Sequence, residues 1–167
     1  PDIHFEFIGD GPEKARAIAL ARQYNLLNVT FQDWMIQEEL VHRLSTADVI
    51  LGTFGTTPQS LITVQNKIYE GLAMKKPIIT GDSPAVRRAL IHGEHIYLCE
   101  RDNPLSLAGA IWTLKQNPTL RQSIAERGHG LYLERFTPCA LGAQFKQYLE
   151  DLLATKRGSA AYSSFFF

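Results

Sequence analysis

The sequence predicts an α/β fold, in which an open parallel sheet carries helices on both faces. Short apolar runs of strand length alternate five times with segments that have helical spacing of their apolar residues. Gly, Pro and small polar residues separate the runs from the helical segments. Such alternation favours right-handed crossover connections and a ligand site at the carboxyl ends of the strands.

The apolar runs and the helical spacing place each element along the chain. Strands are expected at residues 4–8, 28–31, 49–51, from 78 onward, and at 96–99. Helices are expected at 12–24, 37–45, from 66 to 76, at 84–90, 104–116 and 118–134, and from 138 to about 153. Ser83 and Pro84 are typical of an N-cap followed by the first helical position, and Asp82 is expected to share in that cap. The whole is a Rossmann-like three-layer sandwich that ends in helices.

The segment from Ala47 to Asp82 is the most informative part of the chain. A strand is followed by a Gly- and Thr-rich loop, residues 52–65, which has neither helical nor strand spacing. A helix then begins near Asn66, and Pro77 ends it before the next strand. A loop of this kind, leading to a helix N-terminus, holds phosphate through backbone N–H groups and the helix dipole. Glu70, one turn into the helix, could accept hydrogen bonds from a ribose diol, so the pattern predicts a nucleotide site.

Composition excludes several classes of function. The chain has 167 residues with 17 basic and 17 acidic side chains, so no net charge attracts nucleic acid or anionic lipid. No apolar run is long enough to cross a bilayer, and no signal peptide is visible. The two cysteines, Cys99 and Cys139, are expected as reduced, partly buried thiols, which together with the rest indicates a cytoplasmic protein. No His/Cys cluster has metal-ligand spacing, and no metal site is expected.

Both ends of the chain are unusual. The first residues lie almost inside the first strand, which predicts a piece cut at a domain boundary. Residues 1–155 are expected to form one nucleotide-sugar-binding domain and residues 156–167 a flexible tail. The segment from Gly158 has no helical spacing, and an exposed Phe165–Phe167 would favour self-association.

The motifs resemble the C-terminal half of a GT-B glycosyltransferase, in the large retaining group that includes capsule, lipopolysaccharide and mannosyl transferases. The resemblance covers residues 3–153 and rests chiefly on the block KIYEGLAMKKPII, supported by GDGPE, NVTF and TADV. In that family this half binds a nucleotide-diphosphate-sugar donor, and a separate N-terminal domain supplies most of the acceptor site. The resemblance also implies that no metal or other cofactor is obligatory.

The resemblance assigns roles to particular residues. Glu70 would bond the ribose hydroxyls, and the helix start would present its N–H groups to the diphosphate through Asn66, Lys67 and Ile68. Trp34, in the loop after the second strand, would lie near the base, although a packing or lid role is the simpler alternative. Gly9 and Gly11 would let the first loop approach the diphosphate, or they serve only to make a tight turn.

The chain departs from the family pattern in two places. The family often has an earlier glutamate eight positions before the one at Glu70, and Ile62 stands there instead. The Arg and Lys that neutralise the diphosphate lie upstream of the first strand seen here. The missing N-terminal acceptor domain is therefore an expected partner, and any peripheral contact with the inner face of a membrane would pass through that missing half.

Two alternatives to a transferase stay open on this sequence. A non-catalytic nucleotide-sugar-binding module would account for the lost glutamate at Ile62. A nucleotide-sugar epimerase of the same fold would need more acid–base residues in the cleft than the block around Glu70 supplies. The five histidines are expected in structural or solvated positions, and Arg87 and Arg88 on a helix surface.

Overall fold

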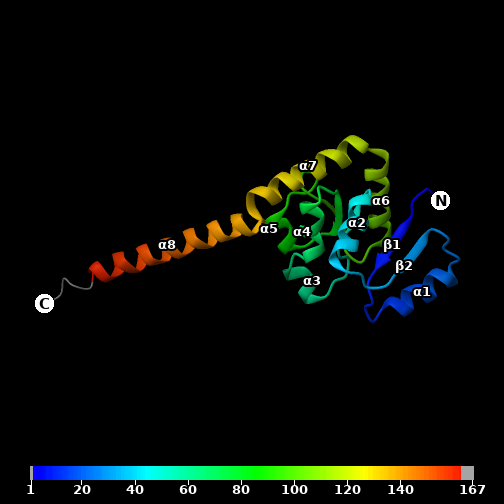
Figure 1. The fold of residues 1–167 in the computed structure, drawn as a ribbon, viewed down its shortest axis with the longest axis horizontal. Helices are drawn as coiled ribbons and strands as arrows, with labels where there is room; N and C mark the ends of the chain where they lie inside the picture. Colours follow the sequence, from blue (N-terminus) through cyan, green and yellow to red (C-terminus); the bar gives the residue numbers. More distant parts are fainter. Residues whose placement is uncertain (1, 163–167) are drawn as a thin grey trace. The chain divides into compact units, whose positions relative to one another are not determined.

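The computed structural model describes residues 2–162, with side chains described for residues 2–155, and it confirms the α/β class (Figure 1). The strands are β1 (Phe5–Ile8), β2 (Val29–Gln32), β3 (Ile50–Leu51), β4 (Ile78–Gly81) and β5 (Tyr97–Cys99). The helices are α1 (Lys14–Gln23), α2 (Gln37–Thr46), α3 (Pro58–Ile62), α4 (Asn66–Ala73), α5 (Pro84–Ala89), α6 (Pro104–Gln116), α7 (Pro118–Arg135) and α8 (Pro138–Tyr162).

The chain forms two compact units, Pro1–Thr46 and Ala47–Phe167. All strand pairs are parallel, as predicted, and they form two sheets rather than one. β1 pairs with β2 in the first unit, and β3, β4 and β5 follow in that order in the second. The expectation of one domain over residues 1–155 stays a prediction.

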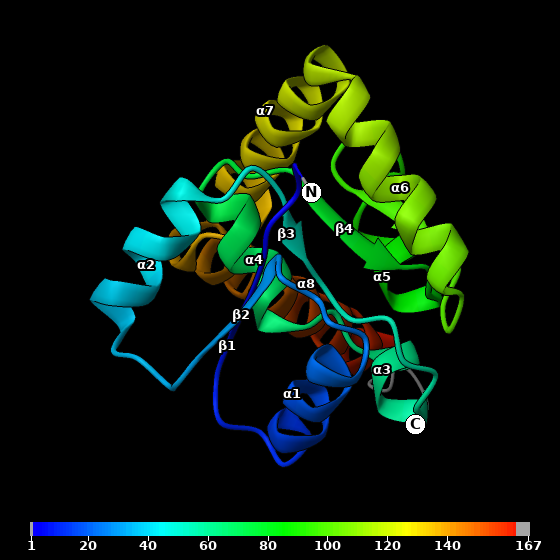
Figure 2. The ribbon, with the colours of Figure 1, turned by 90° about the vertical axis from the view of Figure 1, so that its right-hand side faces the viewer.

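The sheet of the second unit is buried on both faces because its side chains alternate. Ile50 pairs with Ile78, and a Cβ placed on Gly71 of α4 would lie 2.9 Å from the Ile78 side chain, so this pair faces α4. Leu51 pairs with Ile79, and both pack in a cluster with residues of α6. Figure 2 shows α4 and α6 on opposite sides of β4. A strand covered on both faces reads as a continuous apolar run, which is the pattern of Ile78 and Ile79.

α7 joins the two helical layers. Gly128 lies against the carbonyl of His95 and the side chain of Leu72 on α4. His129 Nδ1 lies 2.9 Å from the Leu72 carbonyl oxygen, and Arg121 donates to the Leu114 carbonyl at the end of α6 (2.9 Å). α7 therefore ties α4 to α6 through main-chain carbonyls as well as through apolar contact.

Five helices begin with the same two-residue signal, a short polar cap followed by proline. Ser83 caps α5 by accepting from the Val86 N–H (3.2 Å), as the sequence predicts. The neighbouring Asp82 does not cap the helix; it binds Arg87 instead. Proline fits the first helical position because its φ is already helical and its missing N–H has no intrahelical acceptor there. The other four caps are Thr57, Asn103, Asn117 and Thr137.

The first unit has little interior of its own. No residue between positions 2 and 46 is buried, although the Phe7 and Phe31 rings stack at a centroid distance of 5.3 Å across β1 and β2. Phe7 is 50% exposed. A two-stranded sheet with two helices does not enclose a core of the usual size.

The last helix is longer than the sequence indicates. α8 continues past Leu153, where the sequence places the end of the helix, to Tyr162. The expectation of a flexible tail over residues 156–167 stays a prediction. Of residues 158–162, Ala160 and Ala161 have high helix propensity. The Phe165–Phe167 prediction lies outside the described residues. Among the described residues, no helix combines the length and the apolar character that crossing a bilayer requires.

The two cysteines differ in environment. Cys99 is buried in β5, where burial raises the pKa of its thiol, whereas Cys139 on α8 is exposed rather than partly buried. Both are free thiols, as expected.

Two glycines of α7 allow a matched test of its packing. A Cβ on Gly128 would lie 2.7 Å from the His95 carbonyl oxygen, so Gly128→Ala forces backbone to move and should lower the free energy of unfolding by about 1–3 kcal/mol. Gly130 is exposed and meets nothing within 4 Å, so Gly130→Ala should raise it by up to about 1 kcal/mol through helix propensity. Urea denaturation of both variants measures the difference; equal effects would contradict this packing.

Candidate functional site

A loop that begins at Gly52, directly after β3, is hydrogen-bonded to the carboxyl end of β4. The Gly52 N–H donates to the Ile79 carbonyl (2.8 Å), and the Gly81 N–H donates to the Thr53 carbonyl (3.0 Å). Thr80 Oγ1 bonds both the N–H and the carbonyl of Thr53, each at 3.2 Å. A Cβ on Gly52 would clash with Oγ1 of Thr80 and lie 2.6 Å from its Cβ. The loop is therefore held flat against the end of β4, and only glycine fits at its start.

The middle of this loop contains a short helix, α3. The sequence did not predict it, because the apolar residues of the loop have no helical spacing. α3 starts after Thr57, whose side chain accepts from the Ser60 N–H (3.3 Å), and Pro58 takes the first position. The cap-and-proline pair was the available signal, because five residues are too few for a helical period. Ile62, the residue in place of the family's earlier glutamate, ends α3 and is 71% exposed.

The N-terminus of α4 is arranged to receive an anion. The N-cap residue, Gln65, is extended and makes no side-chain cap. Its side chain instead accepts from the Thr53 hydroxyl (2.7 Å), and its carbonyl accepts from the Ile68 N–H (2.9 Å). Helix geometry leaves the N–H groups of Asn66 and Lys67 without an intrahelical acceptor. These two amides point out of the helix start, where the dipole favours negative charge.

The predicted residues of α4 divide into an anchor and a polar face. The Ile68 side chain is fully buried (0% exposed), so it anchors the helix, and its N–H is already bonded. Asn66, Lys67 and Glu70 are exposed. Lys67 Nζ lies 3.4 Å from the Gly52 carbonyl, which places a cation at the end of β3. The structure therefore brings Asn66, Lys67 and Glu70 together on α4, beside the loop after β3.

The other predicted residues belong to the first unit. Gly9 ends β1 with a φ of 133°, a conformation that L side chains rarely adopt, and its N–H donates to the Gln32 carbonyl (3.2 Å). Gly11 is exposed and has no positive φ. Trp34 follows β2 and is 71% exposed, so most of its surface is open to solvent. A ligand role for these three residues stays a prediction.

A network around Lys14 connects the loops after β1 and β2. Its Nζ donates to Asp10 (2.7 Å), to Asp33 (2.5 Å) and to the Gln32 carbonyl (3.0 Å). Asp10 also accepts from the backbone N–H of Trp34 (2.7 Å). The Lys14 hydrogen bond, followed by the Trp34 N–H, lowers the pKa of Asp10, and the bonds to Asp10 and Asp33 raise the pKa of Lys14. The sequence analysis missed this network; its one local signal was the four-residue spacing from Asp10 to Lys14.

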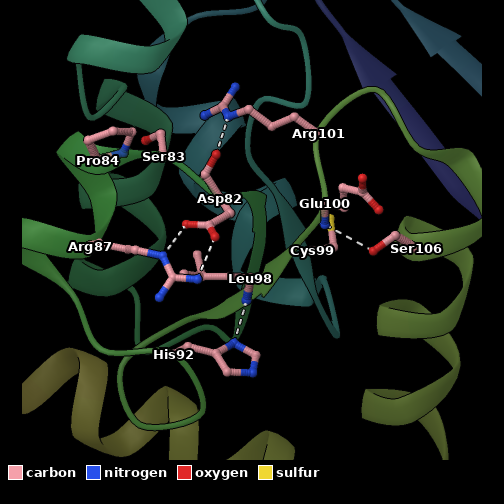
Figure 3. Close-up of a pocket in the computed structure, with 10 residues that line it drawn as sticks. All are labelled: Asp82, Ser83, Pro84, Arg87, His92, Leu98, Cys99, Glu100, Arg101 and Ser106. Carbon is pink, nitrogen blue, oxygen red and sulfur yellow. Dashed lines mark hydrogen bonds and ion pairs between the residues drawn. The ribbon is translucent and has the colours of Figure 1, made fainter.

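An open pocket of about 760 Å³ lies at the carboxyl ends of β4 and β5 (Figure 3). Its polar groups are bonded to one another. Arg87 holds Asp82 with two hydrogen bonds of 2.6 and 2.5 Å, which lowers the pKa of Asp82, and His92 accepts from the Leu98 N–H (2.9 Å). Ser106 accepts from the Glu100 N–H (2.9 Å). None of the residues predicted for nucleotide binding lines this pocket.

Most histidines have structural hydrogen bonds, as expected. His129 bonds a main-chain carbonyl, His92 and His95 bond main-chain N–H groups, and His4 bonds Thr30. Over the part of the chain that the structure describes, no three His, Cys, Asp or Glu side chains form a group suited to a metal ion.

Comparison with known proteins shows the family and the fold. A family model described as "Glycosyl transferases group 1" matches residues 1–117. No curated protein matches the chain. Solved structures below 25% identity do match, and they show the fold alone.

Three solved structures illustrate the fold. HepE of Anabaena, in complex with UDP-glucose, has a TM-score of 0.75 at 18% identity, covering 90% of this chain and 42% of HepE. Sucrose-phosphate synthase of Thermosynechococcus elongatus has a TM-score of 0.73 at 22% identity, covering 90% and 38%. The C-terminal domain of a group 1 glycosyl transferase, LpcC of Francisella tularensis, has a TM-score of 0.59 at 17% identity, covering 75% and 63%. The chain thus spans about two fifths of the first two structures.

The Lys14 network should make the two loops of the first unit sensitive to acid. A lowered pKa means that Asp10 contributes stability above its ordinary value of 3.8 and loses it as the pH falls through the native pKa. Lys14→Met should raise the pKa of Asp10 toward 3.8, because the largest cause of its lowering is gone. Carboxyl ¹³C NMR titration measures it. Arg16→Met, which removes a pair with Glu13 only, is the control, and an unmoved Asp10 pKa in Lys14→Met would contradict the network.

Proposed function

Because this chain belongs to the group 1 glycosyl transferases, we propose that it binds the nucleotide-diphosphate-sugar donor of a retaining GT-B enzyme. That enzyme transfers a hexosyl group to an acceptor hydroxyl in polysaccharide or glycolipid synthesis. The observation that carries the proposal is the start of α4. Two backbone N–H groups there, those of Asn66 and Lys67, have no intrahelical acceptor, and the Lys67 ammonium lies beside the Gly52 carbonyl at the end of β3. Proteins of this fold with UDP-glucose or UDP bound, such as HepE, support a uridine donor, with a guanosine donor as the alternative.

The chemistry of the transfer needs a stabilised leaving group. The bond from the anomeric carbon to the diphosphate oxygen breaks, and the nucleoside diphosphate leaves with the electron pair. The acceptor oxygen bonds the anomeric carbon and passes its proton to the oxygen of the leaving diphosphate. Negative charge grows on the diphosphate, and the amides of Asn66 and Lys67, together with the Lys67 ammonium, stabilise it without a metal.

The remaining contacts fix the nucleoside. Glu70 is exposed one turn beyond Lys67, and its carboxylate can accept from both ribose hydroxyls. Gly9, Gly11 and Trp34 of the first unit are proposed for the diphosphate and the base. The acceptor would be bound by another part of a longer protein, which would work in the cytoplasm, at the inner face of the membrane where the acceptor is a lipid.

One observation favours a second candidate, a binding module without catalysis. Ile62 replaces the earlier glutamate of the family, and its side chain is 71% exposed at the end of α3, in the loop that leads to α4. No neighbouring carboxylate belongs to α3, whose sequence is PQSLI. Donor binding without transfer in the complete protein would identify the module.

Removal of Glu70 tests the donor site directly. Glu70→Ala should weaken UDP binding by about 1.5–3 kcal/mol, as expected for hydrogen bonds to a charged group. Isothermal titration calorimetry measures the affinity. Glu134→Ala, which removes an exposed helical glutamate of α7, is the matched control and should bind like the wild type. Equal affinities for Glu70→Ala and the wild type would remove Glu70 from the site.

The chain alone should not transfer a sugar. The contacts proposed above are to the donor alone, and the acceptor is proposed to bind another part of a longer protein, so at most slow hydrolysis of the donor is expected. Release of radiolabelled sugar from UDP- and GDP-sugars, with and without acceptor, measures both reactions. Robust transfer by these 167 residues would place the acceptor site within this chain and contradict the division of labour.

A further inference from the structure

Arg101, directly after β5, crosses the carboxyl ends of the neighbouring strands. Its Nε donates to the Asp82 carbonyl and its Nη1 donates to the Gly55 carbonyl, both at 2.6 Å. The side chain passes over Gly81, where a Cβ would lie 2.6 Å from Arg101 Cγ. Arg101 therefore joins three chain segments, the ends of β4 and β5 and the loop after β3.

The guanidinium is held without a carboxylate. The Asp82 carboxylate is engaged by Arg87, and Arg101 bonds only the main-chain carbonyl of Asp82. Its Nη2 is buried and has no hydrogen-bond partner, and burial lowers the pKa of Arg101. Arg101 is partly buried, and the Asp82 carboxylate attracts it without hydrogen-bonding it. The two bonds to main-chain carbonyls, rather than a contact ion pair, therefore hold the guanidinium in place. The planar guanidinium in turn holds the carbonyls of Asp82 and Gly55 at a fixed separation.

The loop that Arg101 holds also contacts the start of α4. At its near end, Lys67 Nζ lies 3.4 Å from the Gly52 carbonyl and Thr53 donates to Gln65 Oε1 (2.7 Å). At its far end, Gly55 is held by Arg101 and also accepts from the Ser60 hydroxyl (2.8 Å). A displacement of Gly55 would thus also move Gly52 and Thr53, which contact Lys67 and Gln65 at the start of α4.

We propose that Arg101 is a positioning residue, which holds the Gly52–Gly55 loop in the conformation that lets the start of α4 bind the donor diphosphate. This inference rests on the proposed function, because it concerns the same site. Arg101 itself does not touch the donor; it acts through the loop and α4.

The test compares two nucleotides that differ by one phosphate. UDP and UMP affinities are measured by calorimetry on the wild type, Arg101→Met, Arg101→Lys and Arg121→Met, at a temperature where circular dichroism shows each protein folded. Arg101→Met should weaken UDP about tenfold, the loss expected for about one hydrogen bond to a charged group, and leave UMP unchanged. Arg101→Lys keeps the charge but not the planar guanidinium, so its affinity for UDP should lie between those of the wild type and Arg101→Met. Arg121→Met, which also removes an Arg bond to a main-chain carbonyl, should have no effect.

A structural role alone would give a different result, since general loosening would weaken UDP and UMP equally. That outcome, or unchanged UDP binding in Arg101→Met, overturns the proposal. If Arg101→Met does not fold, Arg101→Lys carries the same comparison.

Hydrogen exchange separates this proposal from the proposed function. Without nucleotide, the Gly52–Gly55 amides should exchange faster in Arg101→Met than in Arg121→Met. Unchanged exchange overturns the role of Arg101. Faster exchange in a chain whose wild type binds neither UDP nor GDP supports the hold on the loop and overturns the donor site.

Discussion

The close passage of the Gly52–Gly55 loop over the end of β4 is the constraint on which the candidate site depends. Gly52 has no room for a Cβ beside Thr80, and Gly81 has none beside Arg101 and the Thr53 carbonyl. Because both positions lack side chains, the loop joins the sheet through main-chain hydrogen bonds rather than leaving it at once. This fixes where the chain can enter α4, and so where its unbonded N–H groups point.

The two units meet their burial requirements differently. In the second unit, alternate side chains of β3 and β4 pack against α4 and α6, so a short sheet anchors both helical layers. In the first unit no residue from 2 to 46 is buried, and order at the strand ends comes from polar bonds around Lys14. Such bonds are weaker than burial in stabilising a fold, and they are screened and titrate with acid. The loops that carry Gly9 and Trp34 therefore depend on these polar bonds for their conformation.

Local signals explain what the sequence could predict. Ser83 with Pro84 caps α5, and Asn66 begins α4, because caps and helix starts depend on adjacent residues. The helix after Thr57 carries the same cap-and-proline signal, but five residues are too few to show a helical period, so apolar spacing alone indicates a loop. The contacts of Arg101 could not be predicted: Gly55 is 46 residues away and Asp82 is 19 away, and only the strand order brings them together.

The charges near the α4 start decide how a diphosphate would be held there. Arg87 is neutralised by Asp82, and Arg101 is bound to two carbonyls, so neither approaches a ligand without breaking its own bonds. Lys67 is exposed and bonds a carbonyl at 3.4 Å, the longest of these contacts, so it can turn toward an anion at little cost. One ammonium with two helix amides balances only part of a diphosphate's charge. Salt would weaken an attraction of this strength. The loop, rather than the charge, sets the positions of the two helix amides. The bond from Arg101 to the Gly55 carbonyl therefore matters more to this site than another surface cation.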